Sequence, residues 1–525
     1  MKKRFINSSF FVSILLSSVF LLPAISVLAQ GGFTLSPVVT RGERVMAGEK
    51  GRFFTNGFGY LAGLSALNNQ GDVVVMSEVG GRCIYGSYLI SKERVIILAD
   101  YFCHPSPIGA ITTFSMANLN DAGQALVLAR INHSFQGLFL YDNGSLTKIV
   151  AEGDVTPLNT TFKYVLSAFL PVGPTLNNRG EVAFAAITED SNGQRQDGIF
   201  VYANGKIRKI VVDGDASPVF GKFGNLIDAH EPARINDKGE VLFCASSTSD
   251  DGKSISYGFF LATDTGIKKV IAVPDRLPIG GYFTSFSCIP DLNNRSEIVF
   301  TAGYGGTPDY PAAVILSSEE QLYTIASTGA PTPIGGKFSF RSINTIDKPR
   351  INNNSAIAFL APIEGGSSSS AIFLASKKAM LKVVAVGDKL PAGEKVTFLN
   401  QFALNDNGQI AFFAFGRKGK PLGVFLATPV TPESSMIEIV QNGGAVELRV
   451  TGNSFITNDT TIEINGVTLE AMSYPEEARE DGGTTRQIIS RDARLEQLLT
   501  PGQTVQVKVF NSLTNRRSEA KEFTR

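Results

Sequence analysis

The stretch PTLNNRGEVAFAA (Pro174–Ala186) decides how this sequence is interpreted, because close copies of it return along the chain. SALNNQGDVVVMS lies near the start and FALNDNGQIAFFA near the end. Seven copies, numbered here as repeats 1 to 7, align on Asn68, Asn120, Asn177, Asn236, Asn293, Asn352 and Asn405. Consecutive copies are 52 to 59 residues apart. A repeat of this length predicts a solenoid, a propeller or an array.

Each repeat is expected to form about four short antiparallel strands. Its apolar runs are rich in Val, Ile and Phe and are bounded by Gly, Asn, Asp and Pro, which is typical of strands and not of helices. The Asn-x-x-Gly segment fits a hairpin turn, because Gly tolerates the positive φ that such turns need. DNG at 142–144 and ANG at 203–205 predict tighter hairpins, and the GD pairs read as turns that join one repeat to the next.

The apolar pattern chooses among all-β architectures. In EVAFAA, Val182, Phe184 and Ala186 occupy one face of the expected strand, and Glu181, Ala183 and Ala185 occupy the other, so neither face is clearly wet. An isolated antiparallel sheet has one dry and one wet face, whereas a sheet between two neighbours is dry on both. We therefore expect a seven-bladed β-propeller over residues 33–428, in which four-stranded sheets surround an axis.

The two ends of the repeat region predict how the ring closes. Repeat 7 stops two strands after its turn, and Phe33–Phe54 resembles the end of a repeat that has no beginning. We expect this N-terminal segment to supply the missing outer strand, which would remove an exposed sheet edge.

The motif resembles the NxxGxxAF tandem repeat of exported bacterial proteins. Asn177–Phe184 and Asn405–Phe412 match it at every specified position, whereas repeats 5 and 6 carry Ser296 and Ser355 in place of the Gly. The turns at these two serines are expected to differ in geometry. The resemblance implies a secreted or cell-envelope protein and no defined reaction.

A change in composition at 429–435 indicates a linker to a second module over residues 436–525. The segments VTGNSF, EINGV and PGQTVQVKV in this module resemble an IPT/TIG domain, an immunoglobulin-like β-sandwich. Such domains act as spacers or binding modules, and the resemblance carries over no functional residue.

Residues 1–29 predict a signal peptide. A basic start is followed by an apolar stretch, and Val27 and Ala29 occupy the positions that a signal peptidase reads. A retained membrane anchor is the alternative. After cleavage we expect a monomeric protein without a membrane span, secreted or in the cell envelope.

The four cysteines of an exported chain predict two disulfides. The sequence favours Cys83–Cys103 and Cys244–Cys288, since each pair falls within one repeat or in adjacent repeats.

Charge and motifs limit the possible functions. Lys plus Arg equals Asp plus Glu, at 48 each, which argues against a nucleic-acid partner. The three histidines are in no metal-ligand pattern, and the Asn-Asp turns lack the spacing of a calcium loop. No metal or cofactor is therefore expected.

One group of charged residues is the candidate site. The residue before the Leu or Ile of each motif is Arg234, Asp291 and Arg350 in repeats 4 to 6, and small or neutral in the others. These positions are expected near the central channel. The neighbouring candidates are His230, Glu231, Asp347 and Lys348. The group predicts either a site for an anionic ligand, since Arg pairs with such groups, or ion pairs between blades.

Two functions follow from these observations. The first is a non-enzymatic binding protein with a propeller platform, for an anionic ligand, a glycan or a cell-envelope protein. The second is a carbohydrate-active hydrolase or lyase with its site in the channel, for which Asp291, Glu231 and Asp347 are the candidate carboxylates. The few recurring acidic positions favour the first.

Overall fold

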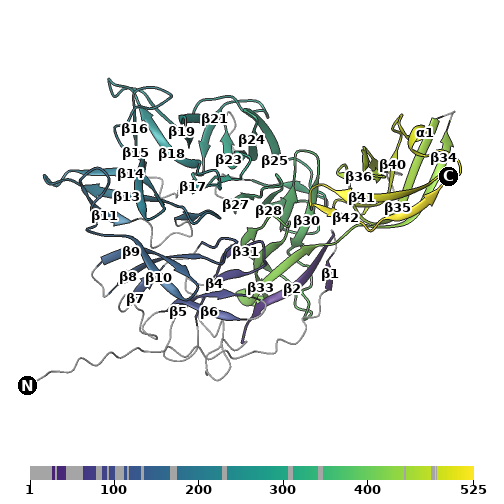
Figure 1. Cartoon of the computed structure of the whole chain (residues 1–525), viewed down its shortest axis with the longest axis horizontal. Coiled ribbons are helices and arrows are strands. Elements are labelled where there is room, and N and C mark those ends of the chain that lie inside the picture. Colours follow the sequence, from purple (N-terminus) through teal and green to yellow (C-terminus); the bar gives the residue numbers. More distant parts are fainter. Residues whose placement is uncertain are drawn as a thin grey trace, which may run out of the picture.

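The computed structural model describes residues 27–29, 32–42, 63–78, 85–91, 94–100, 111–114, 118–131, 135–165, 174–226, 233–305, 311–340, 347–442, 445–473, 479–480 and 482–525. This part of the chain is nearly all β and consists of antiparallel sheets (Figure 1). Its one α-helix is α1 (Leu495–Leu498), and Arg417–Gly419 forms a short 3-10 turn.

Seven sheets carry the seven repeats, and in each the strands are antiparallel, as expected. The first two contain β3 (Gly63–Leu67), β4 (Val73–Glu78), β5 (Tyr85–Ile90) and β6 (Val95–Asp100), then β7 (Ile111–Phe114), β8 (Ala125–Ile131), β9 (Phe135–Asp142) and β10 (Ser145–Ala151). The third contains β11 (Thr161–Val165), β12 (Thr175–Leu176), β13 (Val182–Glu189), β14 (Arg195–Ala203) and β15 (Lys206–Val212).

The next sheets follow the same plan, with a first strand split into two short pieces that both pair with the second strand. The fourth contains β16 (Lys222–Gly224), β17 (Arg234–Ile235), β18 (Val241–Thr248), β19 (Ile255–Thr263) and β20 (Gly266–Ala272). The fifth contains β21 (Phe283–Phe286), β22 (Asp291–Leu292), β23 (Ile298–Tyr304), β24 (Ala312–Ser318) and β25 (Gln321–Ser327). The sixth contains β26 (Lys337–Phe338), β27 (Asp347–Ile351), β28 (Ile357–Glu364), β29 (Ser370–Ala375) and β30 (Met380–Ala385).

The seventh sheet joins the two ends of the repeat region. Its own strands are β31 (Phe398–Leu404), β32 (Ile410–Gly416) and β33 (Lys420–Pro429). The N-terminal strand β2 (Phe33–Thr40) pairs antiparallel with β33, from Phe33 opposite Pro429 to Thr40 opposite Gly423. The expected exchange of an N-terminal strand is therefore present. β1 (Val27–Ala29), the end of the predicted signal peptide, pairs with β2, and the rest of that peptide lies outside the described residues.

Both faces of these sheets are buried, as the apolar pattern predicted. In β13, Phe184 packs with Leu126 and Leu138 of repeat 2, while Ala183 on the other face packs in the cluster that contains Phe243 of repeat 4. Small residues on one sheet thus face large residues on the next. The hydrophobic core lies between neighbouring sheets and not on one side of each.

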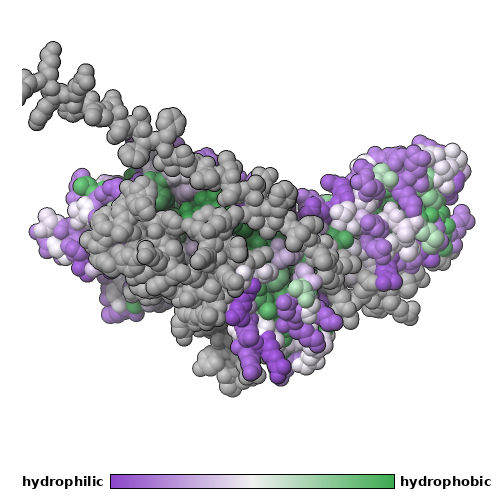
Figure 2. Space-filling model, turned by 90° about the horizontal axis from the view of Figure 1, so that it is seen from below, coloured by the Kyte–Doolittle hydropathy of each residue, from purple (hydrophilic) through white to green (hydrophobic). Residues whose placement is uncertain are grey.

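The C-terminal strands form a separate lobe beside the repeat region (Figure 1; from below, Figure 2). Two sheets enclose one apolar core that includes Leu448, Ile462 and Val507. The first sheet contains β34 (Glu433–Asn442), β35 (Ala445–Ile456), β38 (Met472–Ser473), β39 (Arg479–Glu480) and β40 (Thr484–Ser490). The second contains β36 (Thr460–Ile464), β37 (Val467–Leu469), β41 (Thr504–Asn511), β42 (Arg516–Arg517) and β43 (Lys521–Thr524).

The connection to this lobe is shorter than the linker expected at 429–435. Pro429 is still paired in β33, and Glu433 already pairs with Asn453 in β34, because both ladders extend into the expected linker. The lobe also packs on the repeats. Ile456 and Leu513 belong to the core cluster of repeats 6 and 7, and the Gly482 N–H donates to the Pro333 carbonyl at 3.0 Å.

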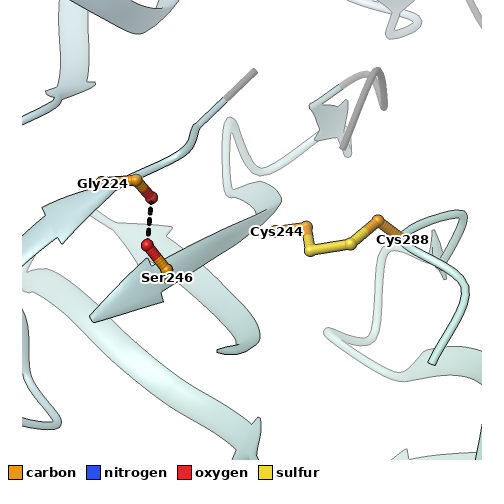
Figure 3. The surroundings of a disulfide bond; sticks show 4 residues. All are labelled: Gly224, Cys244, Ser246 and Cys288. Atoms are coloured by element: carbon orange, nitrogen blue, oxygen red, sulfur yellow. Dashed lines mark hydrogen bonds between the residues drawn. A yellow bond between two sulfur atoms is a disulfide. The ribbon is translucent and has the colours of Figure 1, made fainter. Parts of the chain in front are cut away.

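The predicted disulfide Cys244–Cys288 is present (Figure 3). Cys244 lies in β18 of the fourth sheet and Cys288 lies between β21 and β22 of the fifth, so the bond joins neighbouring sheets. With a sequence separation of 44 residues, the chain-entropy model gives a stabilisation of about 4 kcal/mol. Cys83 and Cys103 lie outside the described residues. In the part of the chain that is described, no helix has the length and hydropathy needed to cross a membrane.

Candidate functional site

The first Asn of each motif organises its own turn. The Asn177 Oδ1 accepts the backbone N–H groups of Arg179 and Glu181 at 3.0 and 2.9 Å. Gly180 closes the turn at φ +78°, where a residue without a Cβ is favoured. The predicted Asn-x-x-Gly hairpin turn is confirmed. The Asn side chain fixes this turn by accepting two of its backbone N–H groups.

The same asparagines also join each repeat to the next. The Nδ2 of each first Asn donates to the backbone carbonyl of the first Asn of the following repeat, at 2.9 to 3.3 Å. In the last bond Asn405 donates to Asn68, 337 positions back in the sequence. The series of hydrogen bonds is therefore cyclic and includes every repeat once.

The second residue of each motif forms another cyclic series. These residues are Asn69, Asp121, Asn178, Asp237, Asn294, Asn353 and Asp406. The backbone N–H of each donates to the side-chain Oδ1 of the next, at 2.7 to 2.9 Å. Their side chains thus point into one shared space.

The side chains of this second series also bond to one another. Asn178 Nδ2 donates to Asp121 Oδ2 at 3.0 Å and to Asp237 Oδ2 at 3.2 Å. Asn69 Nδ2 likewise donates to the carboxylates of Asp121 and Asp406, at 2.8 and 2.9 Å. Each Asp has an Asn on both sides, so no two carboxylates are neighbours in the series.

These residues surround a cavity of about 180 Å³. Its lining repeats the same three positions in every repeat: a Leu or Ile, the first Asn, and the second Asn or Asp. The described residues that line it include three carboxylates and no Lys, Arg or His. We call this the Asx pocket. It is the candidate ligand site, and sequence reasoning missed it because these residues were interpreted only as turn formers.

The structure brings Arg234, Asp291 and Arg350 together, and the three side chains form ion pairs with one another. Asp291 Oδ1 lies 3.7 Å from Arg234 Nε and 4.0 Å from Arg350 Nη1. Arg234 Nε also donates to the Pro290 carbonyl at 3.1 Å, and the Ile351 N–H donates to Asp291 Oδ2 at 3.1 Å. Among the described residues, the lining of the Asx pocket contains none of these three charged side chains.

Of the remaining predicted site residues, the structure describes the side chain of Lys348 alone, and Lys348 is not among the residues that line the Asx pocket. Lys348 is half-buried in β27, two residues before Arg350. His230 and Glu231 lie outside the described residues, as does the side chain of Asp347. No group of three or more His, Cys, Asp or Glu residues in the described part of the chain is arranged to hold a metal ion.

Asp291→Asn is expected to destabilise the protein by about 2 kcal/mol. The change leaves two largely buried guanidinium groups without their shared counter-charge, and the estimate is below the usual cost of breaking a buried pair because both contacts are long. Chemical denaturation measures the effect. Asp264→Asn, in an exposed hairpin, is the matched control and should change stability by no more than about 0.5 kcal/mol. An unchanged stability for Asp291→Asn would contradict the structural role.

The two turns that lack the motif Gly keep the same geometry, contrary to expectation. Ser296 and Ser355 have φ of +63° and +64°, within the left-handed region. Each serine hydroxyl donates to a glutamate of the preceding repeat, Ser296 to Glu240 and Ser355 to Glu297. These bonds offset the backbone cost of a residue with a Cβ at positive φ.

Glu297 shows how strongly the turns are cross-linked. Burial opposes its ionisation, but hydrogen bonds from Ser355, Asn293 and Ser318 outweigh burial and lower the pKa of the carboxyl below its ordinary value. The carboxylate is therefore part of the junction between repeats 5 and 6.

Comparisons with solved structures give only distant likenesses. A Pyrococcus horikoshii acylaminoacyl peptidase is 9% identical with a TM-score of 0.41, and 75% of this chain matches 58% of that one. A Mycobacterium tuberculosis puromycin-hydrolyzing peptidase is 10% identical with a TM-score of 0.38, and 74% of this chain matches 58% of that one. The lectin SapL1 in complex with alpha methyl fucoside is 12% identical with a TM-score of 0.29, and 62% of this chain matches 96% of that one. The matches thus span little more than half of the two peptidases, and TM-scores this low carry no information on function.

The repeat region itself matches a described family. No curated protein matches the chain. A model described as a family of unknown function, DUF7453, matches residues 8–278 and 67–421, which together include every Asn motif. The chain therefore belongs to the DUF7453 family of unknown function.

Proposed function

We propose that the seven sheets are the blades of a seven-bladed β-propeller and that the C-terminal lobe is an immunoglobulin-like module of the IPT/TIG kind. Three observations support the propeller: the cyclic series of Asn hydrogen bonds, the burial of both faces of each sheet, and the pairing of β2 with β33. The two sheets around one core support the sandwich.

We propose further that the protein is an exported, non-enzymatic binding protein whose ligand site is the Asx pocket. One observation carries this proposal: equivalent residues of all seven repeats line a single cavity. Open, concave sites on such axes are where small ligands are usually held. The Cys244–Cys288 bond is compatible with an oxidising, extracellular setting.

The carbohydrate-active alternative has less support from the geometry. Such enzymes need one carboxyl as an acid and another as a base or nucleophile. Asp291 is engaged by two arginines, and each carboxylate of the Asx pocket already accepts several N–H groups. Asp237, for example, accepts three, from the Asn178 backbone and from the side chains of Asn178 and Asn294.

A binding panel of glycans and peptides tests the proposed site. The purified protein is compared with Asn178→Phe, which fills the Asx pocket, and with Asn192→Phe, in an exposed turn. Ligands bound by the wild type and by Asn192→Phe but lost in a folded Asn178→Phe variant would support the proposal. Ligands retained by Asn178→Phe would place binding elsewhere and overturn it.

A further inference from the structure

The motifs that form the Asx pocket are acidic, although the chain as a whole has a net charge of zero. The seven five-residue motifs that begin at the first Asn contain seven acidic and three basic residues, a net charge of −4, whereas the whole chain has a net charge of zero. Arg179, one of the three basic residues, pairs with a carboxylate outside the lining of the pocket, at 2.5 Å from Glu181. Within the described part of the chain, the residues that line the pocket include the three carboxylates Asp121, Asp237 and Asp406 and no lysine or arginine.

In the Asx pocket, hydrogen-bond donors are largely used within the protein, whereas acceptors remain available. Asn69 and Asn178 each donate both amide hydrogens to aspartates of the same series. The seven Oδ1 atoms each accept one backbone N–H and keep a second lone pair. The surface offered to a ligand is thus rich in acceptors and poor in donors.

A ligand of the Asx pocket must therefore bring donors and positive charge. An anion has neither, and a neutral hydroxyl donates but does not balance the carboxylates. The cavity of about 180 Å³ is also smaller than the roughly 300–1,000 Å³ typical of sites for drug-sized molecules, so it suits one small head group. An alkylammonium group meets all three conditions, with three N–H donors on a compact cation.

We infer that the Asx pocket binds a primary ammonium group, supplied by a small free amine or by a lysine side chain of a partner. This inference rests on the proposed binding function and names the ligand class of that site. It replaces the expectation of an anionic ligand, which rested on arginines that are held in ion pairs.

Calorimetric titration with defined probes tests the inference. Cadaverine represents a free amine, and a capped tripeptide with one central lysine represents a partner side chain. The same peptide with acetylated lysine removes the charge, and with trimethylated lysine keeps the charge but removes the donors. We expect the lysine peptide to bind at least about tenfold more tightly than either modified peptide, since a hydrogen bond to a charged group contributes about one to two powers of ten in affinity.

Variants place the interaction in the Asx pocket. Asp237→Asn should weaken the binding of cadaverine or the lysine peptide about ten- to hundredfold, whereas Asp264→Asn, the same change on an exposed hairpin, should leave it unaltered. Circular dichroism verifies that Asp237→Asn is folded. If Asp237→Asn does not fold, the comparison of the modified peptides, which needs no variant, still decides whether an ammonium group is bound.

Each outcome decides one question. Cadaverine binding as tightly as the peptide would indicate a free amine, and peptide binding alone would indicate a partner lysine. Equal binding of the acetylated peptide, undiminished binding by Asp237→Asn, or no binding of either amine at millimolar concentration would overturn the inference. If a panel ligand is lost in Asn178→Phe while both amines fail to bind, the proposed function stands and only the ligand class is wrong.

Discussion

Removal of Phe33–Thr40 is expected to abolish folding of the seventh sheet and to make the protein aggregate. β2 pairs with β33 along its whole length, and Phe33, Leu35 and Val39 are at most 3% exposed. Burial of side chains such as Phe and Leu contributes about 2–5 kcal/mol each, and a typical protein is stable by only about 5–15 kcal/mol. Loss of all three, together with the strand ladder, removes a large part of that stability.

A chain that begins at Arg41 provides the experiment. Size-exclusion chromatography should show aggregates, because the unpaired edge of β33 offers N–H and C=O groups to other chains. A synthetic peptide with the sequence of residues 33–40 should restore part of the monomeric fraction, and a scrambled peptide should not. A truncated chain that is monomeric and as stable as the full chain would contradict the role of β2 in closure.

The all-β architecture of antiparallel sheets could be predicted because its information is local and repeated. The alternation in β13 showed two dry faces, and the Asn-x-x-Gly turns marked the strand ends.

The GD turns contain a Lys–Asp ion pair that the sequence analysis did not predict. In GDASP, Asp215 accepts the Val212 N–H at 2.9 Å and the Lys209 ammonium at 3.0 Å, six residues earlier. Pairs with the same spacing are Lys148–Asp154, Lys269–Asp275 and Lys382–Asp388.

Repeat 5 shows that this signal could have been read from the sequence. The positions that correspond to the Lys and the Asp are Thr324 and Ala330, so both partners are replaced together. Joint replacement of both partners is what one expects of two residues that contact each other.

The Asx pocket could not be predicted from single motifs, because its residues meet only through the cyclic order of the repeats. An Asn or Asp after the first Asn looks like any turn residue. One signal was present: in cyclic order, including the step from Asp406 to Asn69, no Asp follows another Asp. Seven positions cannot alternate perfectly, and the single like pair is Asn294–Asn353, which avoids the repulsion between two carboxylates.

For the predicted Arg and Asp group, the sequence left two alternatives, a site for an anionic ligand or ion pairs between repeats, and the structure shows the ion pairs. The sequence placed Arg234, Asp291 and Arg350 at equivalent positions, but the direction of a long side chain depends on its neighbours in the folded protein. The Asp291 carboxylate lies between two guanidinium groups and supplies a counter-charge to both, so the side chains pair with one another.

Asn293→Ala is expected to cost about 3–5 kcal/mol in the free energy of unfolding. The Asn293 side chain makes four hydrogen bonds: Oδ1 accepts the N–H groups of Arg295 and Glu297, and Nδ2 donates to the Glu297 carboxylate and to the Asn352 carbonyl. The alanine leaves several of these buried groups unsatisfied, and each unsatisfied group costs about 1–3 kcal/mol. Asn192→Ala, in an exposed turn, is the control and should change stability by no more than about 0.5 kcal/mol.

Comparison with Asn405→Ala turns this experiment into a test of ring closure. Asn405 donates to the Asn68 carbonyl at 2.9 Å and so joins the last repeat to the first. In a closed ring every junction has two neighbours that depend on it, and Asn405→Ala should destabilise the protein about as much as Asn293→Ala. In an open array the terminal junction contributes little beyond its own turn. Because Asn405 also bonds to Gln409 within its own turn, part of the loss remains in an open array, and a loss for Asn405→Ala that is smaller than that for Asn293→Ala by about 1 kcal/mol or more would argue that the ring is open in solution.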